Sequence, residues 1–403
     1  MGGGVTTGQR TPGAIQGAAL IAVAVMPTLA IVSLVPNLPQ LFEHFRNVRY
    51  HEILVPMIIT VPSLCIALFS PLAGAAADFW GRRPLLIVSL LAFTVLGLIP
   101  LMLDDLYLIL ASRFVVGVAE AGILTAGNAL LGDYFSGDDR KKWLSNQTTV
   151  GPIAASLLIL AGGKLGSMNW HAPFTLYALG LLVLAWVVFG TWEPARKAAA
   201  HDAVESGAAP FPWSKTAIVG GVTILLSVVY MVQAIQLGRI FGELGVKSPQ
   251  VIGVVVTIAS IGVITGGALY RRLAQLAIGR LFGIIFLALG IGYIGLAAAP
   301  DYRVGLAFAV VAQFGNGLTL PTLISWALSK YGFAHRGRGM GVWGSCFFVG
   351  TFLSPMVVSL VGTFTGSFLR SVGVIGVICL AASVVVWTAA SGRRAPAVLT
   401  PSR

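Results

Sequence analysis

The chain has 403 residues, of which 57% are hydrophobic and only 10% are charged, and its formal net charge is +12. Soluble globular proteins carry about 25% charged residues, so this composition excludes a soluble globular protein. It predicts a chain that is embedded in a lipid bilayer.

Long apolar segments recur along the whole chain. A transmembrane helix needs about 20 consecutive apolar residues, whereas a transmembrane β-strand needs about ten residues of alternating polarity, a pattern that the sequence lacks. The predicted fold class is therefore an all-α integral membrane protein with about twelve transmembrane helices. We place the spans at residues 14–36, 53–73, 85–103, 106–131, 143–163, 174–192, 216–238, 250–270, 281–299, 303–327, 340–361 and 370–391.

A short polar loop separates the second and third spans, where the sequence reads GAAADFWGRRP from residue 74. It combines two glycines, one acid and a basic pair: Gly74, Asp78, Gly81, Arg82 and Arg83. An acid at such a place can accept hydrogen bonds from the free N–H groups at a helix start and oppose the positive end of its dipole. The loop resembles the signature loop of the major facilitator superfamily of transporters, with Phe79 where that family usually has a basic residue.

The resemblance implies a carrier with two six-helix halves that works by alternating access. It also implies that Asp78 contacts the start of the eleventh span only while the cytoplasmic side is closed. We therefore predict that Gly74, Asp78, Gly81, Arg82 and Arg83 form a conformational latch. The alternative is a solvated turn that only follows the distribution of positive charge.

The fourth span contains Arg113 and Glu120, the only charged residues that we place deep within a span. A charge at the bilayer centre costs at least about 3 kcal/mol. The spacing of seven residues puts the two side chains on one helix face, about 10 Å apart along the axis, so we expect their partners on other spans or in a shared cavity. Arg113-x-x-x-Gly117 resembles the superfamily's fourth-helix motif, which implies proton coupling through Arg113 and Glu120. The alternative is a polar pair that only fixes helix packing.

Uncharged polar residues recur within other spans. Singly, such residues usually form hydrogen bonds between helices, but together they predict a substrate cavity near the bilayer midplane, between two related halves. The candidates are Thr28, Asn128, Gln233, Gln236, Gln313 and Asn316.

The longest connection, residues 193–215, divides the predicted spans into two groups of six. We predict an N-terminal half at 1–192, a cytoplasmic linker at 193–215 and a C-terminal half at 216–403. With the N-terminus inside, the inner loops hold more than twice as many Lys and Arg residues as the outer loops. The positive-inside rule then predicts that both termini lie on the cytoplasmic side of a bacterial inner membrane. It also explains the positive net charge without a nucleic-acid partner.

The sequence offers no nucleotide-binding glycine loop, catalytic triad or cluster of His and Cys residues. We therefore expect no enzymatic activity, no cofactor and no metal site. We predict a monomeric, proton-coupled secondary transporter of a small organic solute, with the solute, protons and the lipid bilayer as partners. The alternatives are an uncoupled facilitative carrier, or a membrane sensor or lipid-handling protein on the same fold.

Overall fold

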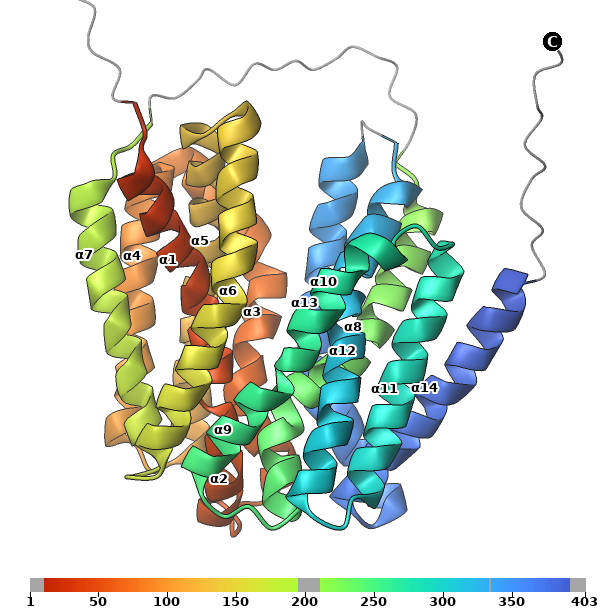
Figure 1. Cartoon of the computed structure of the whole chain (residues 1–403). Helices are drawn as coiled ribbons and strands as arrows, with labels where there is room; N and C mark the ends of the chain where they lie inside the picture. Colours follow the sequence, from red (N-terminus) through yellow and green to blue (C-terminus); the bar gives the residue numbers. More distant parts are fainter. Residues whose placement is uncertain (1–10, 195–210, 333–334, 392–403) are drawn as a thin grey trace, which may run out of the picture. The chain divides into compact units, whose positions relative to one another are not determined.

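The computed structural model describes residues 11–194, 211–332 and 335–391, and these residues are almost wholly helical (Figure 1). Their α-helices and 3-10 helices (η) are α1 (Ala14–Val32), η1 (Val35–Asn37), α2 (Leu38–His44), α3 (His51–Trp80), α4 (Arg82–Leu98), η2 (Ile99–Met102), α5 (Leu106–Tyr134), α6 (Gly137–Gly166), η3 (Ala172–Ala178), α7 (Leu179–Gly190), α8 (Trp213–Glu243), α9 (Pro249–Ala259), α10 (Ile261–Leu273), α11 (Ile278–Ala298), α12 (Tyr302–Lys330), α13 (Arg336–Thr365) and α14 (Phe368–Ser391).

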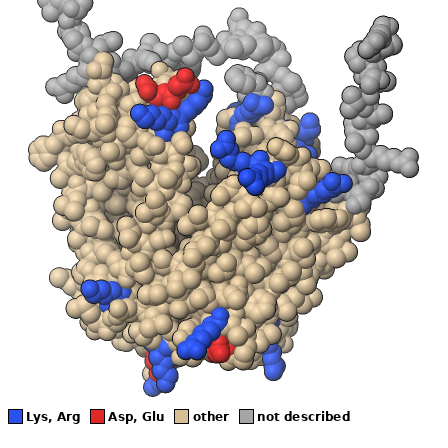
Figure 2. Space-filling model, viewed as in Figure 1, with Lys and Arg blue, Asp and Glu red and all other residues tan. Residues whose placement is uncertain are grey.

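Within the described residues, 12 helical segments are long and apolar enough to cross a membrane. Four of them combine shorter helices: Ala14–His44 contains α1, η1 and α2, Arg82–Met102 contains α4 and η2, Ala172–Gly190 contains η3 and α7, and Pro249–Leu273 contains α9 and α10. Figure 2 shows charged side chains near the two ends of the helices, with a broad uncharged band between them on the face drawn. The predicted all-α, multi-pass membrane fold is confirmed.

The chain divides by packing into two compact units. Unit 1 comprises Met1–Leu34 and Met57–Pro210, and unit 2 comprises Val35–Pro56 and Phe211–Arg403. The segment 35–56 precedes most of unit 1 in the sequence but packs within unit 2. The chain therefore crosses from one unit to the other and back before the third transmembrane helix begins.

In unit 1, α4 packs against α5 and α7, and α1 packs against α5, α6 and α7. Small residues permit close approach of helices where lipid supplies no hydrophobic driving force. Gly117 of α5 is one such residue, because a Cβ atom there would lie 2.5 Å from the Cα of Pro62 and 2.7 Å from the Cβ of Cys65. This contact fixes α5, which carries Arg113 and Glu120, against α3.

In unit 2, α11 packs against α12 and α14, α8 packs against α13, and α10 packs against α12. The long helices α5 and α12 begin in the same way in their respective units. The side chain of Asp105 accepts hydrogen bonds from the N–H groups of Tyr107 and Leu108, and Asp301 accepts them from Arg303 and Val304. Such caps satisfy N–H groups that have no acceptor within the helix.

Candidate functional site

Arg113 lies on α5 with its side chain fully buried. Its guanidinium carbon is 5.3 Å from the ring centroid of Phe174 and 4.9 Å from that of Tyr177, within the range of a cation–π contact. Its Nη2 atom donates hydrogen bonds to the carbonyl oxygens of Leu96 at 3.0 Å and Gly97 at 3.3 Å. Backbone carbonyls and two aromatic rings therefore hold this cation.

The local sequence of α4 explains why these carbonyl oxygens are available. The helix ends at Leu98, and the last carbonyls of a helix lack partners within it and carry partial negative charge. The N–H group that Leu96 would bind in a longer helix belongs to position 100, and Pro100 has none. Gly97 also lets the ring of Tyr177 approach, because a Cβ atom there would overlap that ring.

Glu120 lies seven residues after Arg113 on α5, and its side chain is 1% exposed. Neither of its carboxylate oxygens has a hydrogen-bond partner among the residues that the structure describes. An ionised carboxylate in an apolar interior is costly without such a partner, whereas a protonated carboxyl or a carboxylate with a bound cation is much less so. The two buried charged residues of α5 therefore differ, since Arg113 is held by neighbouring groups, whereas the carboxylate oxygens of Glu120 have no hydrogen-bond partner among the described residues.

Four of the predicted cavity residues lie on α8 and α12 of unit 2, two helices that pack together. Gln233 is buried, and its Nε2 atom donates a hydrogen bond to the carbonyl oxygen of Ala309 at 2.8 Å. The Nδ2 atom of Asn316 lies 3.3 Å from both the carbonyl oxygen of Tyr230 and the Oε1 atom of Gln313. These contacts make a group of neutral amides between the two helices.

Several atoms of this amide group remain without partners among the described residues. They are Oε1 of Gln233, Oδ1 of Asn316, and both Nε2 and Oε1 of Gln236, whose side chain is 1% exposed. A buried polar atom without a partner costs about 1–3 kcal/mol, so the group is suited to bind water or a solute. The other two candidates lie in unit 1, where Thr28 is half-buried on α1 and Asn128 is exposed on α5.

The signature loop forms the junction between α3 and α4. Gly81 has φ +100°, a left-handed conformation that favours glycine. Beyond it, the Glu193 carboxylate accepts hydrogen bonds from the N–H groups of Arg82 at 2.9 Å and Arg83 at 2.7 Å. Glu193 therefore caps the start of α4 from a position about 110 residues further along the chain.

Both arginine side chains of the loop bind elsewhere in unit 1. Arg82 forms an ion pair with Asp133 at the end of α5, and Arg83 donates to the carbonyl oxygen of Val188 at 2.8 Å. Of the remaining latch candidates, Gly74 is half-buried and Asp78 is exposed in the last turn of α3. The predicted contact between Asp78 and the eleventh span stays a prediction.

Sequence reasoning missed four residues of this junction: Asp133, Tyr134, Trp192 and Glu193. The Tyr134 hydroxyl donates to the Trp192 carbonyl and accepts from the Trp192 N–H at 2.9 Å. These contacts join the end of α5 to the segment after α7. The only available signal was the polar start of the predicted linker at Glu193, which does not reveal a partner so distant in sequence.

Comparisons with known proteins agree with this architecture. A family model described as Major Facilitator Superfamily matches residues 18–242. A tetracycline resistance protein, class C, from Escherichia coli is 26% identical over 351 residues, which are 82% of this chain and 85% of that protein. A bacillibactin exporter from Bacillus subtilis (strain 168) is 30% identical over 163 residues, which are 39% of this chain and 40% of that protein.

Solved structures show the same fold at lower sequence identity. A D-xylose-proton symporter matches with a TM-score of 0.73 and 15% identity, covering 94% of this chain and 99% of that one. A bacterial homologue of the human lysosomal transporter Spinster, in an inward-facing and occupied conformation, matches with a TM-score of 0.72 and 16% identity. That match covers 96% of this chain and 100% of the other.

Proposed function

Because this chain belongs to the major facilitator superfamily of membrane transporters, we propose that it is a proton-driven exporter of a small organic solute. The transporter would expose its solute-binding site alternately to the two sides of the membrane. The repeated construction of the units around α5 and α12 supports this proposal, because related halves are the usual basis of alternating access.

The proposed proton coupling rests on the difference between the two buried charges of α5, Arg113 and Glu120. Arg113 is held by the carbonyl oxygens at the end of α4, whereas both oxygens of the buried Glu120 lack partners among the described residues. Ionisable groups at such positions usually serve transport or proton relay. Glu120 would bind a proton in one orientation of the transporter and release it in the other, while Arg113 keeps α4 and α5 together.

The proposed direction of transport rests on the names of the relatives, and the proposed class of solute rests on the amide group. The tetracycline resistance protein aligns with 82% of this chain, and the bacillibactin exporter and a bicyclomycin resistance protein homologue from Haemophilus influenzae align with shorter parts. These names favour export. The neutral amides on α8 and α12 would bind polar, uncharged groups of the solute.

The proposed mechanism also includes a latch at Asp78 and a defined orientation of the chain in the membrane. If the linker and both termini lie on the cytoplasmic side of a bacterial inner membrane, the junction of α3 and α4 would lie on that side too. Asp78 would then help to close that side, and the ordered contacts of Arg82, Arg83 and Glu193 would support it. The chain would act as a monomer.

A flux panel in inverted membrane vesicles tests this function. Tetracycline, bicyclomycin and bacillibactin are offered with and without an imposed pH gradient, and accumulation is measured over time. We expect at least one compound to accumulate only with the gradient. Flux that ignores the gradient would favour an uncoupled carrier, and no flux of any compound would favour a sensor or lipid-handling protein.

The variant Glu120→Gln tests the assigned residue in the same vesicles. Glutamine resembles the protonated acid but exchanges no proton, so gradient-driven accumulation should disappear while solute exchange without a gradient continues. Glu43→Gln is the matched control, since Glu43 is an exposed acid whose ion pair among the described residues is with Arg46, three residues away. Accumulation by Glu120→Gln at the wild-type level would remove Glu120 from the coupling mechanism.

A further inference from the structure

Arg239 near the end of α8 joins several elements of unit 2. Its side chain is only 11% exposed, and its Nη2 atom lies 2.6 Å from Oε2 of Glu52 at the start of α3. Its guanidinium carbon is 4.0 Å from the ring centroid of Phe42 on α2 and 4.1 Å from that of Phe368 on α14. One cation thus holds both arms of the segment 35–56 against the helices of unit 2.

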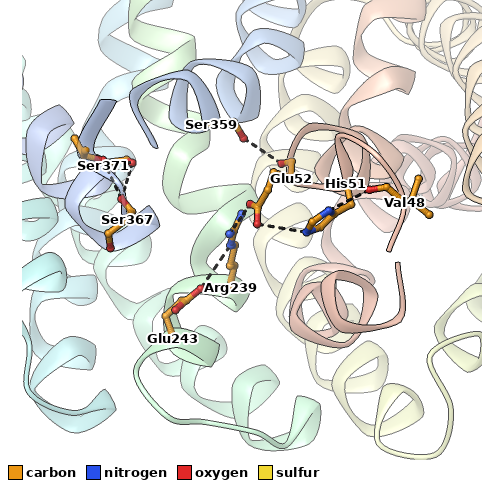
Figure 3. A network of polar contacts seen from close by, with 9 residues as sticks. Val48, His51, Glu52, Arg239, Glu243, Ser359, Ser367 and Ser371 are labelled. Carbon is orange, nitrogen blue, oxygen red and sulfur yellow. Dashed lines mark hydrogen bonds and ion pairs between the residues drawn. The ribbon is translucent and has the colours of Figure 1, made fainter. Parts of the chain in front are cut away.

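A second contact holds the start of α3 in place. Ser359 of α13 donates its hydroxyl hydrogen to the carbonyl oxygen of Glu52 at 3.0 Å. That oxygen would bind the N–H group of position 56 in a regular helix, but Pro56 has none. Figure 3 shows Glu52 in the middle of this network, with Arg239 and Ser359 on two sides and His51 on another.

The two arms of the segment differ in how they connect to unit 1. The first arm leaves α1 through a turn at Ser33 and Leu34, so the helix is interrupted at the point where the chain changes unit. The second arm enters α3, which is one continuous helix from His51 to Trp80 across the other change of unit. A turn can bend, whereas an unbroken helix transmits motion along its length. A movement of unit 1 would therefore displace Glu52 more readily than Phe42.

Two further features are expected if the ion pair between Arg239 and Glu52 opens during transport. The α2 arm is packed closely onto α8, because a Cβ atom at Gly242 would lie 3.1 Å from the Cβ of Pro39. In addition, Arg239 has a second acid within reach on its own helix, since its Nε atom lies 3.9 Å from Oε1 of Glu243. Glu243 can therefore keep the cation paired after Glu52 has left.

We propose that Arg239 is a positioning residue for transport, which holds the start of α3 through Glu52 and releases it in each cycle, while α2 stays attached to α8. Glu52, Arg239 and Ser359 then form an outer clasp, with Glu243 as the partner of Arg239 in the open state. The proposal rests on the alternating-access function above, but the cross-linking experiment below separates the two.

Two double-cysteine variants test the asymmetry directly. Glu52→Cys with Ser359→Cys spans the clasp, and Pro39→Cys with Gly242→Cys spans the packed α2–α8 contact. Each pair is closed with a short bis-methanethiosulfonate linker that dithiothreitol removes, and gradient-driven flux of tetracycline, bicyclomycin and bacillibactin is measured. Of the three native cysteines, Cys65 and Cys379 are buried and stay in place, whereas the half-buried Cys346 is replaced by serine in every variant. Variants with one introduced cysteine control for simple modification.

The linked clasp should transport at least tenfold more slowly than its reduced form, whereas the linked α2–α8 pair should stay within twofold. Flux through the linked clasp within twofold of the reduced form would refute the proposal, and so would a block by both linkers. Absence of gradient-driven flux in the unlinked wild type would instead refute the proposed function, and with it the clasp's role in transport.

A second measurement needs no solute and no linker. Gln236 lies one turn before Arg239 on α8 and is buried, so Gln236→Cys can report access from the outer side to a membrane-impermeant thiol reagent. Glu52→Gln weakens the closed clasp and should speed labelling at least fivefold. Glu243→Gln removes the partner of the open state and should slow it, while Glu43→Gln should leave it unchanged. Equal labelling rates in all variants, or shifts in the same direction for Glu52→Gln and Glu243→Gln, would overturn the proposal.

Discussion

The cap that Glu193 provides for α4 gives a prediction whose size follows from the structure. The carboxylate accepts two backbone hydrogen bonds, of 2.9 Å from Arg82 and 2.7 Å from Arg83, at a helix end where these N–H groups have no acceptor within the helix. Replacing a capping side chain with alanine costs about 0.5–2 kcal/mol, and loss of an acid at the positive end of a helix costs about 0.3–1 kcal/mol. Because the site is exposed, we expect Glu193→Ala to destabilise the first turn of α4 by about 1–2 kcal/mol in total.

Hydrogen exchange of the Arg82 and Arg83 amides measures this loss locally. A change of about 1–2 kcal/mol corresponds to exchange that is roughly 5–30 times faster. Asp138→Ala is the matched control, because Asp138 is an exposed acid whose ion pair, within the part of the chain that the structure describes, is with Lys141 on its own helix. Unchanged exchange at Arg82 and Arg83 in Glu193→Ala would refute the assignment of Glu193 as the cap.

Three further predictions concern the latch, the topology and the amide group. Asp78→Asn should retain expression but lose most transport, because a neutral amide opposes a helix dipole less well; unchanged flux together with unchanged thiol labelling of cytoplasmic cysteines would contradict the latch. Reporter fusions after residue 200 and at the C-terminus should report cytoplasm and a fusion near residue 48 should report the outside, and a reversed result at any position would overturn the orientation. Gln236→Leu should raise the thermal stability of the detergent-purified protein, by about 1–3 kcal/mol per unpaired amide atom removed, and reduce transport; a lower melting temperature would show that the amide has partners.

The number and type of the spans could be predicted because the bilayer imposes the length of each apolar run. The ends of the spans could not, since helices continue into polar sequence. The second predicted span, 53–73, extends in α3 to Trp80, and the eighth, 250–270, is interrupted at Ser260 between α9 and α10. Apolar content alone also could not reveal that residues 35–56 pack within unit 2, because that depends on contacts between segments far apart in the chain.

The candidate site was predictable to the extent that it depends on rare residue types. Arg113 and Glu120 stand out because charges within spans are few. Arg113 donates hydrogen bonds to backbone carbonyls, which every residue has, so the sequence does not identify them. The one sequence feature related to them is Pro100, which lacks the N–H group that would otherwise bind the Leu96 carbonyl. Glu193 was equally hidden, because a cap supplied from about 110 residues away follows no local pattern.

If Glu120 couples proton movement to transport, binding of solute should release the proton that Glu120 holds. The most direct measurement adds a solute that the wild-type protein transports to purified protein in weakly buffered detergent solution, and follows proton release with a pH-sensitive dye. We expect release of about one proton per bound solute in the wild type, and binding without release in Glu120→Gln. Equal proton release by the two proteins would contradict this coupling.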